Sequence, residues 1–185
     1  MNILESAPGA QYDLRALALY WAGQTDAAGK AAGVIELAKS WQAGQLSLDT
    51  QAGLQAQTTI PGRPALPELI SPKFVKHRSM RTSEGRAALI HALTHIEFNA
   101  INLALDAIWR FAGMPPAYYV DWLQVAGEEA LHFSLLAGHL ETLGHRYGDF
   151  AGHNSMWEMA AAASSPTCAN LARVRGVASS PRASS

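Results

Sequence analysis

The chain has 185 residues, of which 49% are hydrophobic and 16% charged, and its formal net charge is −1. This composition favours one globular domain with a substantial core over a disordered chain. A charge so close to zero gives no electrostatic basis for binding nucleic acid or an anionic membrane surface. The single cysteine, Cys168, excludes an internal disulfide framework and suits a reducing compartment.

Targeting segments are not evident. The first residues, MNILESAPGAQYDLRALALYWAG, lack the basic region followed by an apolar region that marks a secretory signal. No run reaches the roughly 18 consecutive apolar residues that a membrane helix needs. The sequence therefore predicts a soluble cytoplasmic protein that does not enter a membrane.

Residues 11–43 have the apolar spacing of two short helices. Asp26 is placed to cap the second of them, because a carboxylate at this position accepts from the free N–H groups of the first turn. Within the second helix, Ile35, Leu37 and Trp41 recur at helical spacing.

Residues 44–80 interrupt the helical pattern. The stretch TTIPGRPALPELISPK has prolines at positions 61, 64, 67 and 72, which exclude a regular helix or strand. Its apolar side chains favour an ordered connector wrapped over the core rather than a free linker. The side chains expected to be buried there are Leu66, Leu69, Ile70 and Phe74.

Two long helices follow, together covering residues 82–143. The first is predicted over 82–112, with an N-cap in TSEG and an end at Gly113. The second is predicted from Pro116 to about Leu143, closed by Gly144. Because the turn between them is short, they are expected to pack antiparallel in an all-α helical bundle.

The expected inward faces of this helix pair carry unexpected polar residues. On the first helix the face is apolar except for Thr94 and Glu97, and on the second it is apolar except for Glu129 and His132. The positions are 90, 93, 94, 97, 101, 104, 105 and 108 on the first helix, and 122, 125, 126, 129, 132, 133, 136, 140 and 143 on the second.

These polar positions favour a metal site. Glu129 and His132 are three residues apart and project to the same side of their helix. A buried carboxylate without a partner loses several kcal/mol of hydration or becomes protonated, so two acids and an imidazole in one interior favour a compensating cation. Carboxylate and imidazole ligands together suit iron, manganese or zinc rather than calcium. The predicted ligands are Glu97, Glu129 and His132.

Other readings stay open for these residues. Glu97 alone is compatible with a buried acid paired with an Arg, a His or a Tyr hydroxyl, and His132 alone with a hydrogen-bonded core histidine. Glu128 is expected in solvent and His139 in the core or supporting the ligands. His91 and His95 are expected to pack against the connector or to lie at the surface. Asp106 is expected to pair with Arg110 at i+4.

Long motifs across the chain resemble one family. PGRPALPELISP, GRAALIHALTHIEFNAINLALDAIWRFAGMP, GEEALHFSLLAGHLETLGHRYGDF and MWEMA resemble bacterial ferritin-like proteins of unknown function, over about residues 12–162. The resemblance implies a ferritin-like di-iron or di-manganese carboxylate bundle, with Glu97, Glu129 and His132 as ligands of iron or manganese. It supplies no substrate.

The resemblance ends at about residue 163, where family members continue with a second helix pair that carries another Glu and another Glu-x-x-His. We therefore interpret residues 1–163 as the ferritin-like domain and residues 164–185 as a disordered or aberrant tail. A truncated or frameshifted copy is one hypothesis. A homodimer that covers the exposed bundle face and rebuilds a full ligand set is the other.

Two functional hypotheses follow, and the sequence alone does not decide whether the chain is an enzyme. The first is a metal-dependent oxidoreductase or oxygenase that reacts with oxygen or peroxide. The second is a non-catalytic helical interaction or metal-storage module, in which the polar trio is only a structural network.

Overall fold

A computed structural model describes residues 12–74, 78–154 and 157–158. The chain divides into two compact units, Met1–His153 and Asn154–Ser185. In the second unit the described residues form part of a helical turn, with the Glu158 N–H donating to the Asn154 carbonyl over 3.0 Å. The expected tail, residues 164–185, lies outside the described residues.

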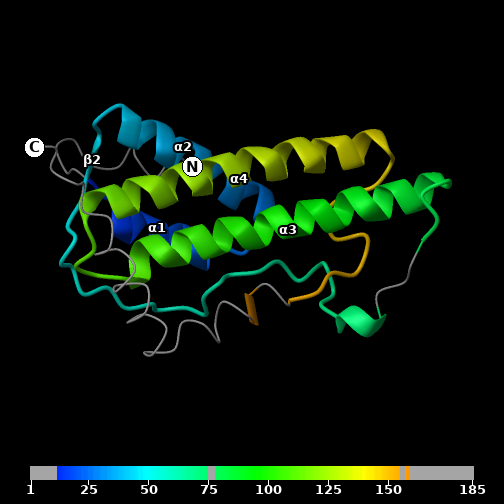
Figure 1. Ribbon diagram of the computed structural model, residues 1–185, viewed down its shortest axis with the longest axis horizontal. Helices are drawn as coiled ribbons and strands as arrows, with labels where there is room; N and C mark the ends of the chain where they lie inside the picture. Colours follow the sequence, from blue (N-terminus) through cyan, green and yellow to red (C-terminus); the bar gives the residue numbers. More distant parts are fainter. Residues whose placement is uncertain (1–11, 75–77, 155–156, 159–185) are drawn as a thin grey trace, which may run out of the picture. The chain divides into compact units, whose positions relative to one another are not determined.

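The first unit is an all-α bundle, as predicted (Figure 1). Its elements in chain order are β1 (Tyr12–Asp13), α1 (Leu14–Gly23), α2 (Ala27–Gln42), β2 (Leu46–Ser47), the 3₁₀ turn η2 (Pro72–Phe74), α3 (Ser83–Arg110) and α4 (Pro116–Thr142).

The long helices α3 and α4 lie side by side and run in opposite directions (Figure 1). The first and last residues of both helices agree with the predicted bounds to within two residues, because the signals that end a helix act locally. Gly113 and Gly144 have φ of +74° and +77°, a conformation that glycine adopts without steric strain and that ends a helix. The Thr82 side chain caps α3 by accepting from the Gly85 N–H at 3.0 Å.

The short helices α1 and α2 pack against one side of this pair, α1 on α3 and α2 on α4. Each begins at an aspartate cap. Asp13 accepts from the Ala16 N–H over 3.0 Å, and Asp26 accepts from the Gly29 N–H over 3.1 Å, so the predicted cap at Asp26 is confirmed. Small residues such as Ala18, which is fully buried, let the helices approach closely.

Arg15 fixes the end of the bundle where α1 meets α3. It is 1% exposed, and its guanidinium donates to the carbonyl oxygens of Ile108 (3.3 Å), Asp49 (3.0 Å), Ala52 (2.9 Å) and Trp109 (2.8 Å). These carbonyls belong to the end of α3 and to the loop after β2. A buried cation is tolerated here because every acceptor is a backbone oxygen that needs a donor.

The connector between β2 and α3 is irregular and runs along the bundle, as predicted. Of the four side chains expected to be buried there, Ile70 is half-buried and the other three are exposed. Leu66, Leu69 and Phe74 are 58%, 40% and 75% exposed. The buried residues are instead Pro61, Gly62 and Pro67. Backbone hydrogen bonds, together with the buried prolines and the partly buried Ile60, hold this segment to the helices.

The segment after α4 turns back over α3 and pairs with the connector. The Ile70 N–H donates to the Gly152 carbonyl, and the Gly152 N–H donates to the Glu68 carbonyl, both over 2.9 Å. This contact covers the side of α3 that carries His91 and His95, which are buried rather than at the surface. No helix among the described residues is long and apolar enough to cross a membrane.

Candidate metal centre

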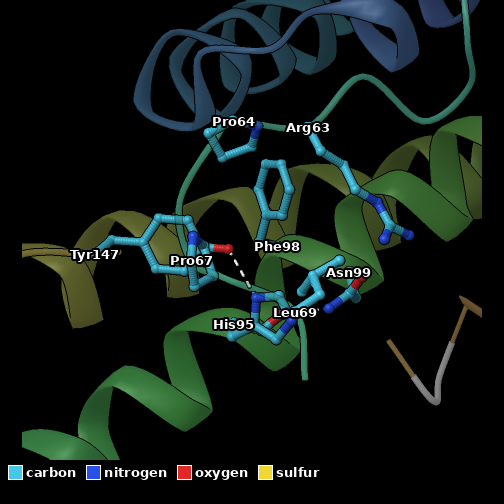
Figure 2. Close-up of a pocket in the computed structure, with 8 residues that line it drawn as sticks. All are labelled: Arg63, Pro64, Pro67, Leu69, His95, Phe98, Asn99 and Tyr147. Carbon is cyan, nitrogen blue, oxygen red and sulfur yellow. Dashed lines mark hydrogen bonds between the residues drawn. The ribbon is translucent and has the colours of Figure 1, made fainter. Parts of the chain in front are cut away.

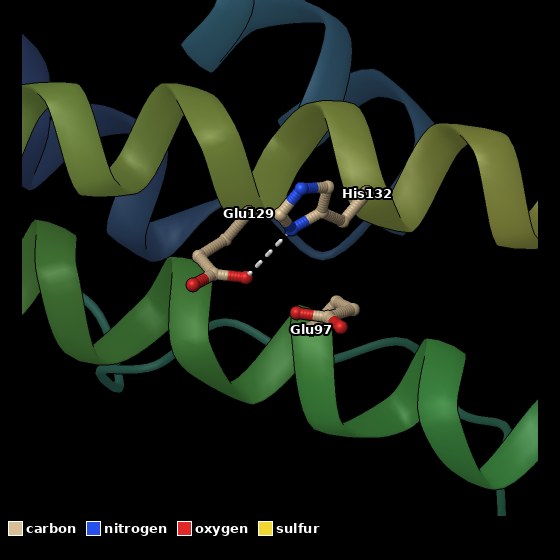
Figure 3. Close-up of side chains that lie close together, drawn as sticks. All are labelled: Glu97, Glu129 and His132. Atoms are coloured by element: carbon tan, nitrogen blue, oxygen red, sulfur yellow. Dashed lines mark hydrogen bonds and ion pairs between the residues drawn. The ribbon is translucent and has the colours of Figure 1, made fainter.

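The three predicted ligands come together between α3 and α4. Glu97 projects from the middle of α3 toward Glu129 and His132, which project from adjacent turns of α4 (Figure 3). Each side chain offers one ligand atom, and these three atoms all lie within 4.8 Å of one another. The antiparallel packing places residues near the middle of both helices at the same level, which brings together groups about 30 positions apart in sequence.

The trio lies at the edge of the helix interface, not in the core as the apolar spacing predicted. Glu97 and Glu129 are half-buried and His132 is exposed. The side chains of Glu129 and His132 retain 25% and 54% exposure. The prediction placed them too deep because no described segment covers this edge of the α3–α4 pair.

Glu129 and His132 already contact each other. His132 Nδ1 lies 3.3 Å from Glu129 Oε2, a weak charge-assisted contact across three positions of one helix. This contact orients the imidazole so that Nδ1 points toward the two carboxylates (Figure 3).

The electrostatics of the trio favour a cation. Burial, then a hydrogen bond with Glu129 and the charge of that carboxylate, together raise the pKa of Glu97 from 4.5 to about 7. Of the groups that shift this pKa, only His132 lowers it. Two carboxyl groups held this close share a proton at neutral pH unless a positive charge replaces it.

The donor set fits a transition metal ion. Ligand atoms bound to opposite sides of one zinc-sized ion are about 4 Å apart, given metal–oxygen and metal–nitrogen distances near 2 Å. The three ligand atoms lie within 4.8 Å of one another, so a small adjustment of the side chains would bring them to the distances that one bound ion requires. Two carboxylate oxygens and one imidazole nitrogen suit iron, manganese or zinc, and three protein ligands leave coordination positions open.

Other polar residues that the sequence singled out have structural roles. Asp106 and Arg110 form the predicted ion pair, with two contacts of 2.6 and 2.7 Å. Glu128 is exposed and accepts from Gln124 at 2.9 Å. His139 is exposed near the end of α4, so its expected place in the core is wrong.

A buried hydrogen-bond network around His95 was not predicted from the sequence. His95 Nε2 is 3.0 Å from the His153 carbonyl, which can only accept, so Nε2 carries the proton. Nδ1 then accepts from the Tyr147 hydroxyl at 2.8 Å (Figure 2). The Tyr147 ring also stacks on His91, with ring centroids 5.4 Å apart. Tyr147 lies in a loop beyond α4, and no short-range spacing connects it with α3.

This network borders a small cavity between the connector and α3. Its volume is about 20 Å³, the space of roughly one water molecule. The lining residues are Arg63, Pro64, Pro67, Leu69, His95, Phe98, Asn99 and Tyr147 (Figure 2). Such a cavity is too small for an organic substrate.

The sequence matches one known protein family over most of its length. The sequence profile of a family described as "Protein of unknown function (DUF455)" matches residues 23–178. The chain belongs to the DUF455 family. The match includes both long helices and all three residues of the trio, and it extends beyond residue 162, where the resemblance was expected to end.

An uncharacterised protein of Haemophilus influenzae (strain ATCC 51907 / DSM 11121 / KW20 / Rd) is similar to this DUF455 member. The two are 53% identical over 113 residues, which cover 57% of this chain and 39% of the relative. The chain thus spans well under two thirds of that relative's length. No solved structure matches the chain.

Proposed function

We propose that this DUF455 chain is a metal-binding protein of the ferritin-like, di-iron or di-manganese carboxylate type, with oxidoreductase activity. The observation that supports this function is the convergence of Glu97, Glu129 and His132 within 4.8 Å, from two antiparallel helices. One Glu on a helix and a Glu-x-x-His on its neighbour form half of the ligand set of a di-metal carboxylate bundle.

Each member of the trio has a distinct role in this proposal. Glu97 and Glu129 supply the carboxylate charge that balances a divalent cation, and His132 supplies a nitrogen ligand through Nδ1. The buried rings on the core side, Phe98 and Phe133, are tilted against each other with centroids 5.9 Å apart and keep water from reaching the site from within. A bound iron or manganese would supply one-electron redox chemistry.

A second function is a non-catalytic metal-storage or interaction module. The exposure of His132 favours it, because an ion held at an open edge exchanges with solvent more readily than one held in a closed core. The two functions share the same ligands and differ in whether the bound ion turns over a substrate.

Iron loading tests the metal site. The protein is incubated with Fe(II) without oxygen and desalted, and its iron content per chain is measured. We expect retained iron in the wild type and a loss of at least about tenfold in affinity for Glu129→Ala, because removal of a carboxylate ligand leaves two donors.

Glu128→Ala is the matched control, since Glu128 is the adjacent carboxylate on α4 and points into solvent. It should retain iron as the wild type does. A folded wild type that keeps no iron, or equal iron in both variants, would rule out the proposed site.

A further inference from the structure

The outer face of the α3–α4 pair exposes large apolar side chains next to the trio, on both helices. Leu89, Leu93 and Ile96 on α3 are 43%, 38% and 41% exposed, and Leu131 and Leu135 on α4 are 50% and 63% exposed. We call these five residues the apolar face. Clusters of exposed large apolar side chains of this kind mark interaction surfaces.

Helical spacing puts the metal ligands beside the apolar face, at its end nearer to the α3–α4 turn. Leu93 is one turn before Glu97 on α3, and Leu135 is one turn after His132 on α4. Helices α1 and α2 cover the opposite side of the pair and leave this one uncovered by the described residues. Whatever covers the apolar face therefore also closes the open side of the trio.

Residues 1–11 and 159–185 offer few large apolar side chains to this face. Residues 159–185 contain four large apolar residues, Met159, Leu171, Val174 and Val177, and the last three recur at helical spacing over less than two turns. Residues 1–11 contain only Met1, Ile3 and Leu4. These segments lack the apolar stripe that would match five exposed leucine and isoleucine side chains.

We propose that the apolar face binds a second copy of this chain, and that the two trios then form one shared metal centre. This inference rests on the proposed metal site. A two-fold axis through the trio brings identical apolar faces together and adds Glu97, Glu129 and His132 of the partner subunit. The shared centre has four carboxylates and two imidazoles.

Charge makes this dimer depend on metal. With metal bound, the four carboxylates bear four negative charges, which two divalent cations neutralise. Without cations, the negative charge that each trio keeps repels that of the other across the interface, and the monomer is favoured. Because ion binding and association are linked, each strengthens the other by the same factor.

Manganese(II), which is stable in air, is the probe for this inference. The full chain is analysed with EDTA and with Mn(II), and its mass is measured by light scattering and its bound metal by elemental analysis. We expect a monomer in EDTA and a dimer in Mn(II), with about one ion per chain. The electron paramagnetic resonance spectrum of the dimer should show coupled Mn(II) ions rather than isolated ones.

Leu135→Glu and Leu131→Glu place a charge in the apolar face and leave the three ligands intact. Both variants should remain monomers in Mn(II), and their Mn(II) affinity should fall about tenfold or more because the coupling to association is lost. Tyr20→Glu is the control, since Tyr20 is a 42% exposed aromatic on α1, away from this face. Circular dichroism verifies that all variants keep the helical fold.

The outcomes separate this inference from the proposed function. A wild type that binds Mn(II) as a monomer would overturn the shared centre and leave the metal site standing. A dimer that forms equally in EDTA, or that both leucine variants leave intact, would also overturn it. A folded chain that binds neither Fe(II) nor Mn(II) would overturn the proposed function itself.

Discussion

At the scale of single residues, Lys30 shows how the bundle is tied together. Its side chain is fully buried, and Nζ lies 3.2 Å from the Ala22 carbonyl, 2.8 Å from the Gly62 carbonyl and 2.6 Å from Asn102 Oδ1. Burial and then the charge of Arg63 lower its pKa to about 7. The three acceptors, however, match the three N–H donors of an ammonium group and favour the protonated form.

Substitution of Lys30 by methionine should therefore destabilise the protein. The Ala22 carbonyl keeps the Gly62 N–H as a donor at 2.8 Å, but the Gly62 carbonyl and Asn102 Oδ1 lose the lysine. We expect the free energy of unfolding to fall by about 1–3 kcal/mol, the usual effect of buried acceptors left without a donor. Urea denaturation measures this difference.

Lys39→Met is the control for this prediction. Lys39 lies on the same helix, is exposed, and pairs only with Glu36 at 2.7 Å. Its loss should change the free energy of unfolding by less than about 0.5 kcal/mol. Equal effects of the two substitutions would mean that the buried contacts of Lys30 do not stabilise the fold.

At the scale of elements, the connector is attached at Gly62. The Gly62 N–H donates to the Ala22 carbonyl, and a Cβ at this position would overlap the backbone carbonyl of Gly23 and lie 2.6 Å from the Gln24 carbonyl. Only glycine lets the connector approach the end of α1 this closely. Backbone approach of this kind has no apolar signal in the sequence, which is why leucines were predicted as the anchors instead.

Gly62→Ala should loosen the connector and destabilise the protein. We expect the free energy of unfolding to fall by about 1–3 kcal/mol, as for other overpacked sites, and the connector to be cleaved faster in limited proteolysis. Gly53→Ala is the control in the same connector, since a Cβ there meets nothing within 4 Å. If Gly53→Ala had the same effect, close packing at Gly62 would not be the cause.

At the scale of the whole molecule, the return of the chain after α4 makes stability depend on pH. Gly148 donates its N–H to His91 Nε2 at 3.0 Å, which requires a neutral imidazole. Burial and then the charge of His95 lower the pKa of His91 from 6.5 to about 4, while Asp149 opposes them. Between about pH 4 and pH 6.5, His91 therefore binds a proton in the unfolded chain but not in the folded chain.

The free energy of unfolding should therefore fall as the pH decreases from about 6.5 to 4, by at most ~1.4 kcal/mol per pH unit from this one residue. Urea denaturation over this pH range should show that the difference in free energy of unfolding between the wild type and His91→Gln becomes smaller as the pH falls, because glutamine does not titrate. Parallel pH profiles for the two proteins would mean that the pKa of His91 is the same in the folded and unfolded states.

Local sequence patterns predicted the two long helices, their ends and the residues of the candidate site. Caps at Asp26 and Thr82 and stops at Gly113 and Gly144 act through neighbouring backbone groups, so local reading was sufficient. Glu129 and His132 share one side of a helix for the same reason, and a short turn fixed the antiparallel partner that carries Glu97.

Burial and the long-range contacts, by contrast, depend on how distant segments pack together. The trio lies at an open edge, the connector is attached through Gly62 and Lys30, and Tyr147 covers His91 and His95 from a loop more than 50 residues away. Apolar spacing tells which face of a helix prefers to be covered, but not which segment covers it. That choice depends on loop paths and on backbone hydrogen bonds between distant segments, and neither has a local sequence signal.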